Sequence, residues 1–196
     1  LVLPGTLNMS EITSIGSKAF AYCYCFEGDL NLESAEKIGI WAFLSTDITS
    51  VTIGDKVEDI PSYAFAWCNS LTSVTIPKGM KTIGNNAFDS VPITAIELPN
   101  SLTKIGDKAF LDCANLQSVT IGSSGQSRLD TVGTDAFKNA GSASDGLQIT
   151  VHTSPDLVTG LENLPDATFT VEAVAAADDK ISDEPDAPTL QKAIDD

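Results

Sequence analysis

Short segments in which Val, Ile or Leu alternates with Ser, Thr or another small or polar residue recur along the chain. Alternation with a period of two is typical of a β-strand that buries one face. Pro or Gly often follows such a segment and predicts that the strand ends there in a turn. The predicted strands are Ile48–Ile53, Leu71–Ile76, Ile93–Leu98, Leu116–Ile121 and Leu147–Val151, with a weaker one at Leu30–Leu32.

A second phrase, Ile-Gly-x-x-Ala-Phe, recurs between these strands in slightly varied form. The spacings between its phenylalanines are 22 or 23 residues, except for a last spacing of 27 that accommodates extra residues at 123–128. A fixed period of this size indicates a stacked solenoid, in which one unit cannot bury its apolar face alone. Because Ala and residues three or four positions away share a helical face, we expect one helical turn around each phenylalanine. The phenylalanines are Phe20, Phe43, Phe65, Phe88, Phe110 and Phe137.

The complete pattern, Leu-x-x-Val-x-Ile-Pro-x-x-x-x-x-Ile-Gly-x-x-Ala-Phe-x-x-Cys, resembles the BspA-like leucine-rich repeat over residues 1–152. The ordinary leucine-rich repeat carries Asn or Cys after its strand, where this chain has Pro or Gly. The resemblance implies an α/β solenoid: a right-handed stack of about six repeats with a parallel β-sheet on one face. The other face would hold short strands and helical turns.

The resembled family consists typically of secreted or surface-attached proteins of host-associated bacteria and anaerobes. Its members are linked to adhesion and to the binding of host or matrix proteins. The resemblance therefore implies an extracellular or cell-surface location and a protein partner. It supplies no catalytic motif and no defined ligand-binding residues to transfer.

After residue 152 the repeat register is lost. We expect residues 153–174 to form a C-terminal cap, with a strand from Thr168 to Val171, because an open solenoid end would expose apolar core. Residues 175–188 are rich in Ala, Asp and Pro and are expected to be an acidic linker. Residues 189–196 are expected to begin a further helix or module and resemble the start of a FIVAR-type module.

The chain is acidic, with 27 acidic and 11 basic residues and a net charge of −16. Residues 1–152 carry 16 acidic and 9 basic groups, whereas 153–196 carry 11 and 2. Such a charge disfavours nucleic acid and anionic lipid as partners. The sequence holds no apolar run of about 18 residues, so we expect no membrane insertion, and we expect a monomer.

Three cysteines, Cys23, Cys68 and Cys113, each lie three residues after a repeat phenylalanine, in alternate repeats. Equivalent positions two turns apart are about 10 Å distant, which exceeds the roughly 7 Å limit for a disulfide. We therefore expect these cysteines to be small buried core residues. No metal site, cofactor or catalytic residue is expected, because no cluster of ligands or nucleophile motif is present and His152 is the only histidine.

Two faces of the predicted solenoid could bind a partner. The outward positions of the strands form a Ser/Thr-rich face that could accept an extended protein, although small hydroxyl groups also suit a merely solvated sheet. The candidates on this sheet face are Thr52, Thr75, Glu97, Thr120 and Thr150.

The turn face varies more from repeat to repeat than the sheet face does. The second variable position of Gly-x-x-Ala-Phe and the position two residues after Phe carry aromatic residues only in the first three repeats. Trp and Tyr are favoured binding anchors, although they could instead cover the core. The candidates on the turn face are Tyr22, Trp41, Tyr63 and Trp67.

These features together predict a non-enzymatic recognition protein, secreted or at the cell surface, that binds a host or microbial protein. Two alternatives remain open. The chain could be a structural spacer that projects other modules from the cell surface, or it could bind glycans through the aromatic residues near Trp41 and Tyr63.

Overall fold

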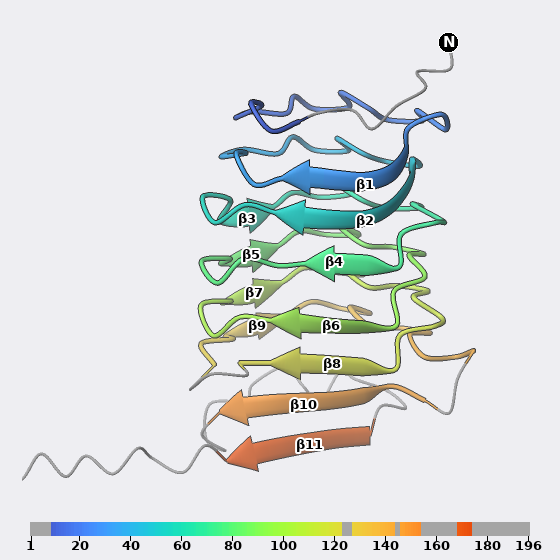
Figure 1. The fold of residues 1–196 in the computed structure, drawn as a ribbon. Coiled ribbons are helices and arrows are strands. Elements are labelled where there is room, and N and C mark those ends of the chain that lie inside the picture. The colour runs from blue at the N-terminus through green and yellow to red at the C-terminus, as the bar shows by residue number, and fades with distance from the viewer. Residues whose placement is uncertain (1–8, 123–126, 144–145, 154–167, 174–196) are drawn as a thin grey trace, which may run out of the picture.

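The computed structural model describes residues 9–122, 127–143, 146–153 and 168–173, which form a stack of parallel-stranded turns, here called rungs (Figure 1). The front face in Figure 1 carries two sheets in line, which we together call the front sheet. Their hydrogen-bonded orders are β1-β2-β4 and β11-β10-β8-β6, and β4 and β6 are neighbours in the stack without a paired ladder. The strands are β1 (Glu27–Leu32), β2 (Asp47–Ile53), β4 (Ser73–Thr75), β6 (Ala95–Leu98), β8 (Ser118–Ile121), β10 (Gln148–Thr153) and β11 (Thr168–Ala173).

A third sheet, made of two-residue strands, lies behind the front sheet in the order β3-β5-β7-β9 (Figure 1). All of its pairings are parallel, and each joins one rung to the next. The solenoid and the front-face strands predicted from the alternating pattern are thus confirmed, although the strands differ by a few residues at their ends. The rear strands are β3 (Asp59–Ile60), β5 (Thr82–Ile83), β7 (Lys104–Ile105) and β9 (Thr131–Val132).

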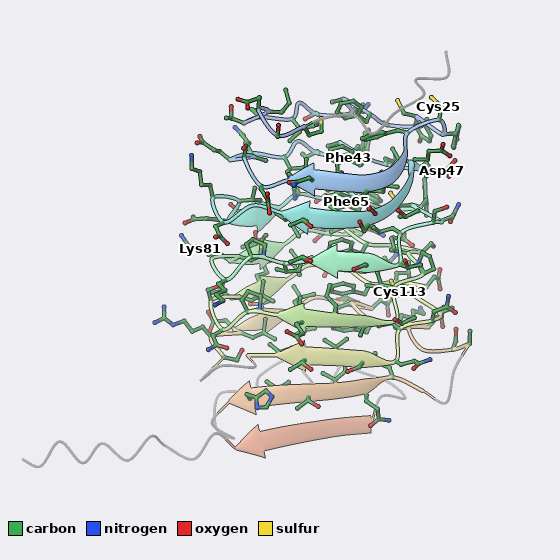
Figure 2. All side chains as sticks on the ribbon, in the orientation of Figure 1. Cys25, Phe43, Asp47, Phe65, Lys81 and Cys113 are labelled. Carbon is green, nitrogen blue, oxygen red and sulfur yellow. The ribbon has the colours of Figure 1, made fainter. Side chains whose placement is uncertain are left out.

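The phenylalanines of the repeat form one continuous stack along the solenoid axis. Neighbouring rings are 5.0–5.5 Å apart between centroids and lie within 9° of parallel. Figure 2 shows two of them, Phe43 and Phe65, in the interior between successive rungs. The four middle rings are fully buried, whereas Phe20 in the first rung is only partly buried. Phe26 packs beside the start of this stack, with centroids 5.2 Å from Phe20 and 6.3 Å from Phe43. Because each repeat ring stacks on the rings of the neighbouring rungs, the core is nearly one-dimensional.

The expected helical turn around each phenylalanine is wrong: the described residues contain no helix. Successive N–H groups instead alternate between two kinds of acceptor. The N–H of Ala19 donates to the carbonyl of Gly16 in its own turn at 3.2 Å, whereas the N–H of Phe20 donates to the carbonyl of Ala42 in the next rung at 2.8 Å. An α-helix would direct these donors four residues back along its own chain. Each pair of neighbouring rungs meets at a junction, and three backbone hydrogen bonds of the second kind cross each of the five junctions on the turn face. These bonds hold the turn face together.

This alternating pattern places two residues of every rung in the left-handed backbone region, at φ between 54° and 61°. They are the same two variable positions that carry the aromatic candidates of the first three rungs. The residues are Lys18, Tyr22, Trp41, Ser45, Tyr63, Trp67, Asn86, Ser90, Lys108, Asp112, Asp135 and Asn139.

The four cysteines are free thiols, and two of them match the prediction of buried core residues. Cys68 and Cys113 are fully buried, and their Sγ atoms donate to the carbonyls of Phe43 at 3.1 Å and Phe88 at 3.0 Å. For Cys23 the prediction is wrong, because this side chain in the outermost described rung is only partly buried. Figure 2 shows Cys113 within the stack and Cys25 at its surface.

Burial of Cys113 predicts a loss of stability in alkali. Burial raises the pKa of this thiol from its ordinary value of 9.0 to about 12, because the apolar interior disfavours the thiolate. The unfolded chain ionises first, so the stabilisation is complete below pH 9 and declines toward pH 12. The free energy of unfolding should fall by about 1.4 kcal/mol per pH unit in that window.

Cys113→Val tests this expectation, since Val91 holds the equivalent position of the preceding rung. Urea denaturation at pH 8 and pH 10.5 should show a smaller alkaline loss in the variant than in the wild type. Equal losses in the two proteins would mean that other groups account for the pH dependence.

The C-terminal region is described only in part. The strand expected near Thr168–Val171 is present as β11 and pairs in parallel with β10. The other expected parts of the cap, the acidic linker at 175–188 and the beginning of a further module at 189–196 lie outside the described residues.

Candidate functional site

The turn face of the first three rungs contains a groove of about 540 Å³. All four aromatic residues singled out in the sequence on this face line it, although they come from three different rungs. We call this feature the aromatic groove. Its lining residues are Lys18, Ala21, Tyr22, Trp41, Leu44, Tyr63 and Trp67.

The aromatic side chains of the groove contact one another across rungs. Trp41 and Tyr63 occupy the same position in neighbouring rungs, and their rings meet edge to face at 6.0 Å between centroids. The ring centroids of Tyr22 and Tyr24 are 6.4 Å apart, so Tyr24 extends the aromatic surface beside the groove. Trp67 and Tyr22 remain 42% and 55% exposed. A soluble protein that exposes several large aromatic rings at one place commonly uses that place to bind a ligand.

The backbone beneath these rings is unfavourable for aromatic residues. Tyr22, Trp41, Tyr63 and Trp67 all have φ of 59–61°, where a side chain with a Cβ atom costs about 1 kcal/mol or more. Asn and Asp tolerate this conformation better than other residues with a side chain. In the last three rungs the same positions hold mainly Asn and Asp. Backbone preference therefore does not explain the aromatic residues of the groove.

Local polar contacts replace aromatic ones farther along the same face. Asn86 and Ser90 donate to the two carboxylate oxygens of Asp89 at 3.0 and 2.8 Å. Two rungs later, Asn139 Nδ2 donates to Asp112 Oδ1 at 2.6 Å. These side chains satisfy one another, so the turn face changes from an aromatic surface to a self-contained polar one.

Lys18 is a lining residue that the sequence reasoning missed. Its Nζ lies 4.2 Å from the centroid of the Trp41 ring, a cation–π contact between neighbouring rungs. The sequence held a signal for it, because Lys18 fills the same repeat position as Trp41 and Tyr63. Within the described part of the chain, Lys18 forms no salt bridge.

The five sheet-face candidates lie elsewhere, on the front sheet. Thr52 pairs in register with Thr75, and Thr120 lies between Glu97 and Thr150. Their side chains are exposed or half-buried, as the alternating pattern predicted. They form two in-register rows, separated where β4 and β6 do not pair.

The described residues show no group of three or more metal-binding side chains. No helix among them is long and apolar enough to cross a membrane. The chemistry of the aromatic groove is that of a contact surface, which offers ring faces, two phenol hydroxyls and one ammonium group.

Comparison with known families agrees with this architecture. The model of the BspA type leucine rich repeat region matches six copies, within residues 6–93 and 36–153. The chain therefore belongs to the BspA-type leucine-rich repeat family. Leucine-rich repeat proteins generally mediate protein interactions, and both the family and its fold are typically non-catalytic.

Solved structures of similar proteins come from bacteria. A leucine-rich repeat protein from Bacteroides ovatus has a TM-score of 0.62 and 24% identity, over 83% of this chain and 41% of that one, and shows the same fold. A leucine rich cell surface protein from Faecalibacterium prausnitzii has a TM-score of 0.49 and 26% identity, over 75% and 46%. The pneumococcal vaccine antigen PcpA has a TM-score of 0.42 and 16% identity, over 85% and 61%.

The chain thus spans less than two thirds of the length of each of these proteins. A comparison with curated protein sequences gave no match.

Proposed function

We propose that this chain is a non-enzymatic recognition module of a secreted or surface-attached bacterial protein. It binds a host or microbial protein through the aromatic groove, in the manner of an adhesin. Membership of the BspA-type family is consistent with a role in protein interaction at the cell surface. The proposal depends above all on one observation: four aromatic residues from three rungs line one groove while occupying left-handed backbone positions.

The reasoning is energetic. Each of these four residues costs folding free energy through its backbone conformation, and Trp67 and Tyr22 recover little of it because about half of each side chain is exposed. Exposed aromatic rings contribute most when a partner covers them, since Trp and Tyr dominate binding energy at interfaces. A spacer would gain nothing from this arrangement.

Replacing Trp67 or Trp41 by Asn should abolish binding while leaving the fold intact. Asn already holds the equivalent positions at Asn139 and Asn86, so each variant keeps a side chain suited to the backbone. The measurement is binding of fluorescently labelled protein to panels of host cells and bacteria. A matched control is Thr120→Lys on the sheet face, which should bind as the wild type does. If only Thr120→Lys loses binding, the binding site lies on the front sheet and not in the aromatic groove.

Stability measurements distinguish a Trp67 that binds a partner from a Trp67 that covers the hydrophobic core. The free energy of unfolding of Trp67→Asn should stay within about 1 kcal/mol of the wild type, since backbone relief offsets the apolar contact that is lost. A loss above about 2 kcal/mol would identify Trp67 as a cover over the core. Treatment of the target cells with protease should abolish wild-type binding, whereas glycosidase treatment should not. The reverse pattern would favour glycan recognition.

A further inference from the structure

The ammonium group of Lys18 lies over the ring of Trp41, 4.2 Å from its centroid, and forms no salt bridge to a described residue. Its side chain is exposed, and its backbone is held at φ 60°. An ammonium group on a flexible stem, held only by a ring face near the surface, is bound weakly and exchanges readily. The ring of Trp41 is therefore paired with a cation from the preceding rung of the same chain.

We infer that Lys18 is an internal stand-in for a cationic side chain of the partner. The aromatic groove recognises an Arg- or Lys-containing protein segment, whose cation displaces Lys18 from Trp41. This inference rests on the proposed function and names the chemistry of its partner. An arginine is the better ligand, because its planar guanidinium stacks on aromatic rings and is less strongly hydrated than an ammonium.

The charge of the chain is complementary to such a partner. The net charge is −16 overall, and residues 1–152 alone carry 16 acidic against 9 basic groups. A field of this sign draws basic segments toward the surface. Within the groove Lys18 is the only charged lining residue, so its displacement into solvent removes the one local repulsion that an incoming cation meets.

The geometry of the groove suits more than one cationic or apolar side chain. Trp67 is 42% exposed and Tyr22 is 55% exposed, so two further ring faces remain available beside Trp41. These rings belong to successive rungs of the stack, which are about 5 Å apart. An extended segment lying along the solenoid axis could therefore place alternate side chains on neighbouring rings.

Intrinsic fluorescence gives a direct assay, since both tryptophans of the chain, Trp41 and Trp67, line the groove. The probe is a capped peptide of alternating Gly and Arg, and its Gly/Glu counterpart serves as the control ligand. The Arg peptide should change the tryptophan emission saturably, whereas the Glu peptide should not. Trp41→Asn should abolish the saturable change reported by Trp67.

Removal of the internal competitor provides the decisive variant. Lys18→Gln should bind the Arg peptide roughly two- to fivefold more tightly than the wild type, which is the gain expected from losing one exposed cation–π competitor. Lys108→Gln is the matched control, because Lys108 holds the same repeat position in the fifth rung and has the same backbone conformation. It changes the net charge equally and should leave the affinity within experimental error.

Three results would overturn the inference. One is weaker binding of the Arg peptide by Lys18→Gln, another is an equal gain in both lysine variants, and the third is an emission change with the Glu peptide only. The proposed function has a separate readout. If Trp41→Asn loses protease-sensitive cell binding but the Arg peptide never binds, protein recognition stands and the cationic chemistry is wrong. If cell binding is unaffected by Trp41→Asn and Trp67→Asn, the proposed function itself fails.

Discussion

Phe88→Ala should lower the free energy of unfolding by about 3–5 kcal/mol, the usual cost of truncating a buried phenylalanine. Phe88 is fully buried and lies between Phe65 and Phe110, with centroid distances of 5.5 and 5.4 Å. The substitution removes both ring contacts and leaves a cavity in the middle of a one-dimensional core. Since domains are stable by only about 5–15 kcal/mol, the variant should unfold at a much lower urea concentration.

Two controls define what this result means. Phe88→Leu keeps most of the volume and should cost less than half as much. Phe20→Ala removes the outermost described ring, which is partly buried and stacks on the next repeat phenylalanine at 5.3 Å, so its loss should also be smaller. Equal losses for Phe88→Ala and Phe20→Ala would contradict a core whose strength depends on neighbours on both sides.

Gly84→Ala should destabilise the solenoid by about 1–3 kcal/mol, the range of an overpacked site. A Cβ atom at Gly84 would lie 2.6 Å from the backbone nitrogen of Ser62 and 2.8 Å from the carbonyl carbon of Pro61 in the preceding rung. Backbone atoms held by inter-rung hydrogen bonds cannot move away cheaply. The rungs would have to separate locally, which weakens the junction.

The first repeat supplies the matched control. Gly16 fills the same position of the motif, but a Cβ atom there meets nothing within 4 Å. Gly16→Ala should therefore be nearly neutral, and thermal or urea denaturation of both variants measures the difference. Pro61 occupies this position in the third repeat and, unlike Gly84, has no N–H to donate across the junction. Similar losses in Gly16→Ala and Gly84→Ala would contradict the close approach of rungs as the cause.

Much of the candidate site was predictable, because residues that differ from their counterparts in the other repeats stand out against a regular pattern. Aligning the repeats shows that Trp41 and Tyr63 hold one position and Tyr22 and Trp67 hold another, so their grouping on one face follows from the period. Their interpretation as binding anchors is still a proposal. The alignment did not reveal the role of Lys18, because a lysine at an exposed turn position is common and its contact with Trp41 depends on how the side chains pack.

The helical turn was the main error, and its cause is local. Over a single turn, the spacing of Ala, Phe and Cys fits a helix and a run of tight turns equally well. The decision depends on acceptors about 22 residues away: Phe20 donates to Ala42, and Tyr22 donates to Leu44 at 2.7 Å. Donors directed to the next rung cannot also close helical bonds within their own turn.

The sequence alone determined the solenoid, its period, its strands and the recurring phenylalanine positions, because these depend on which residues recur and on how often. Only the tertiary structure decided the left-handed backbone of the variable positions, the groove that joins three rungs and the placement of Lys18 on Trp41. The physical reason is that these features arise from contacts between rungs. Such contacts fix backbone conformation and side-chain position through neighbours that are distant in sequence and adjacent in space.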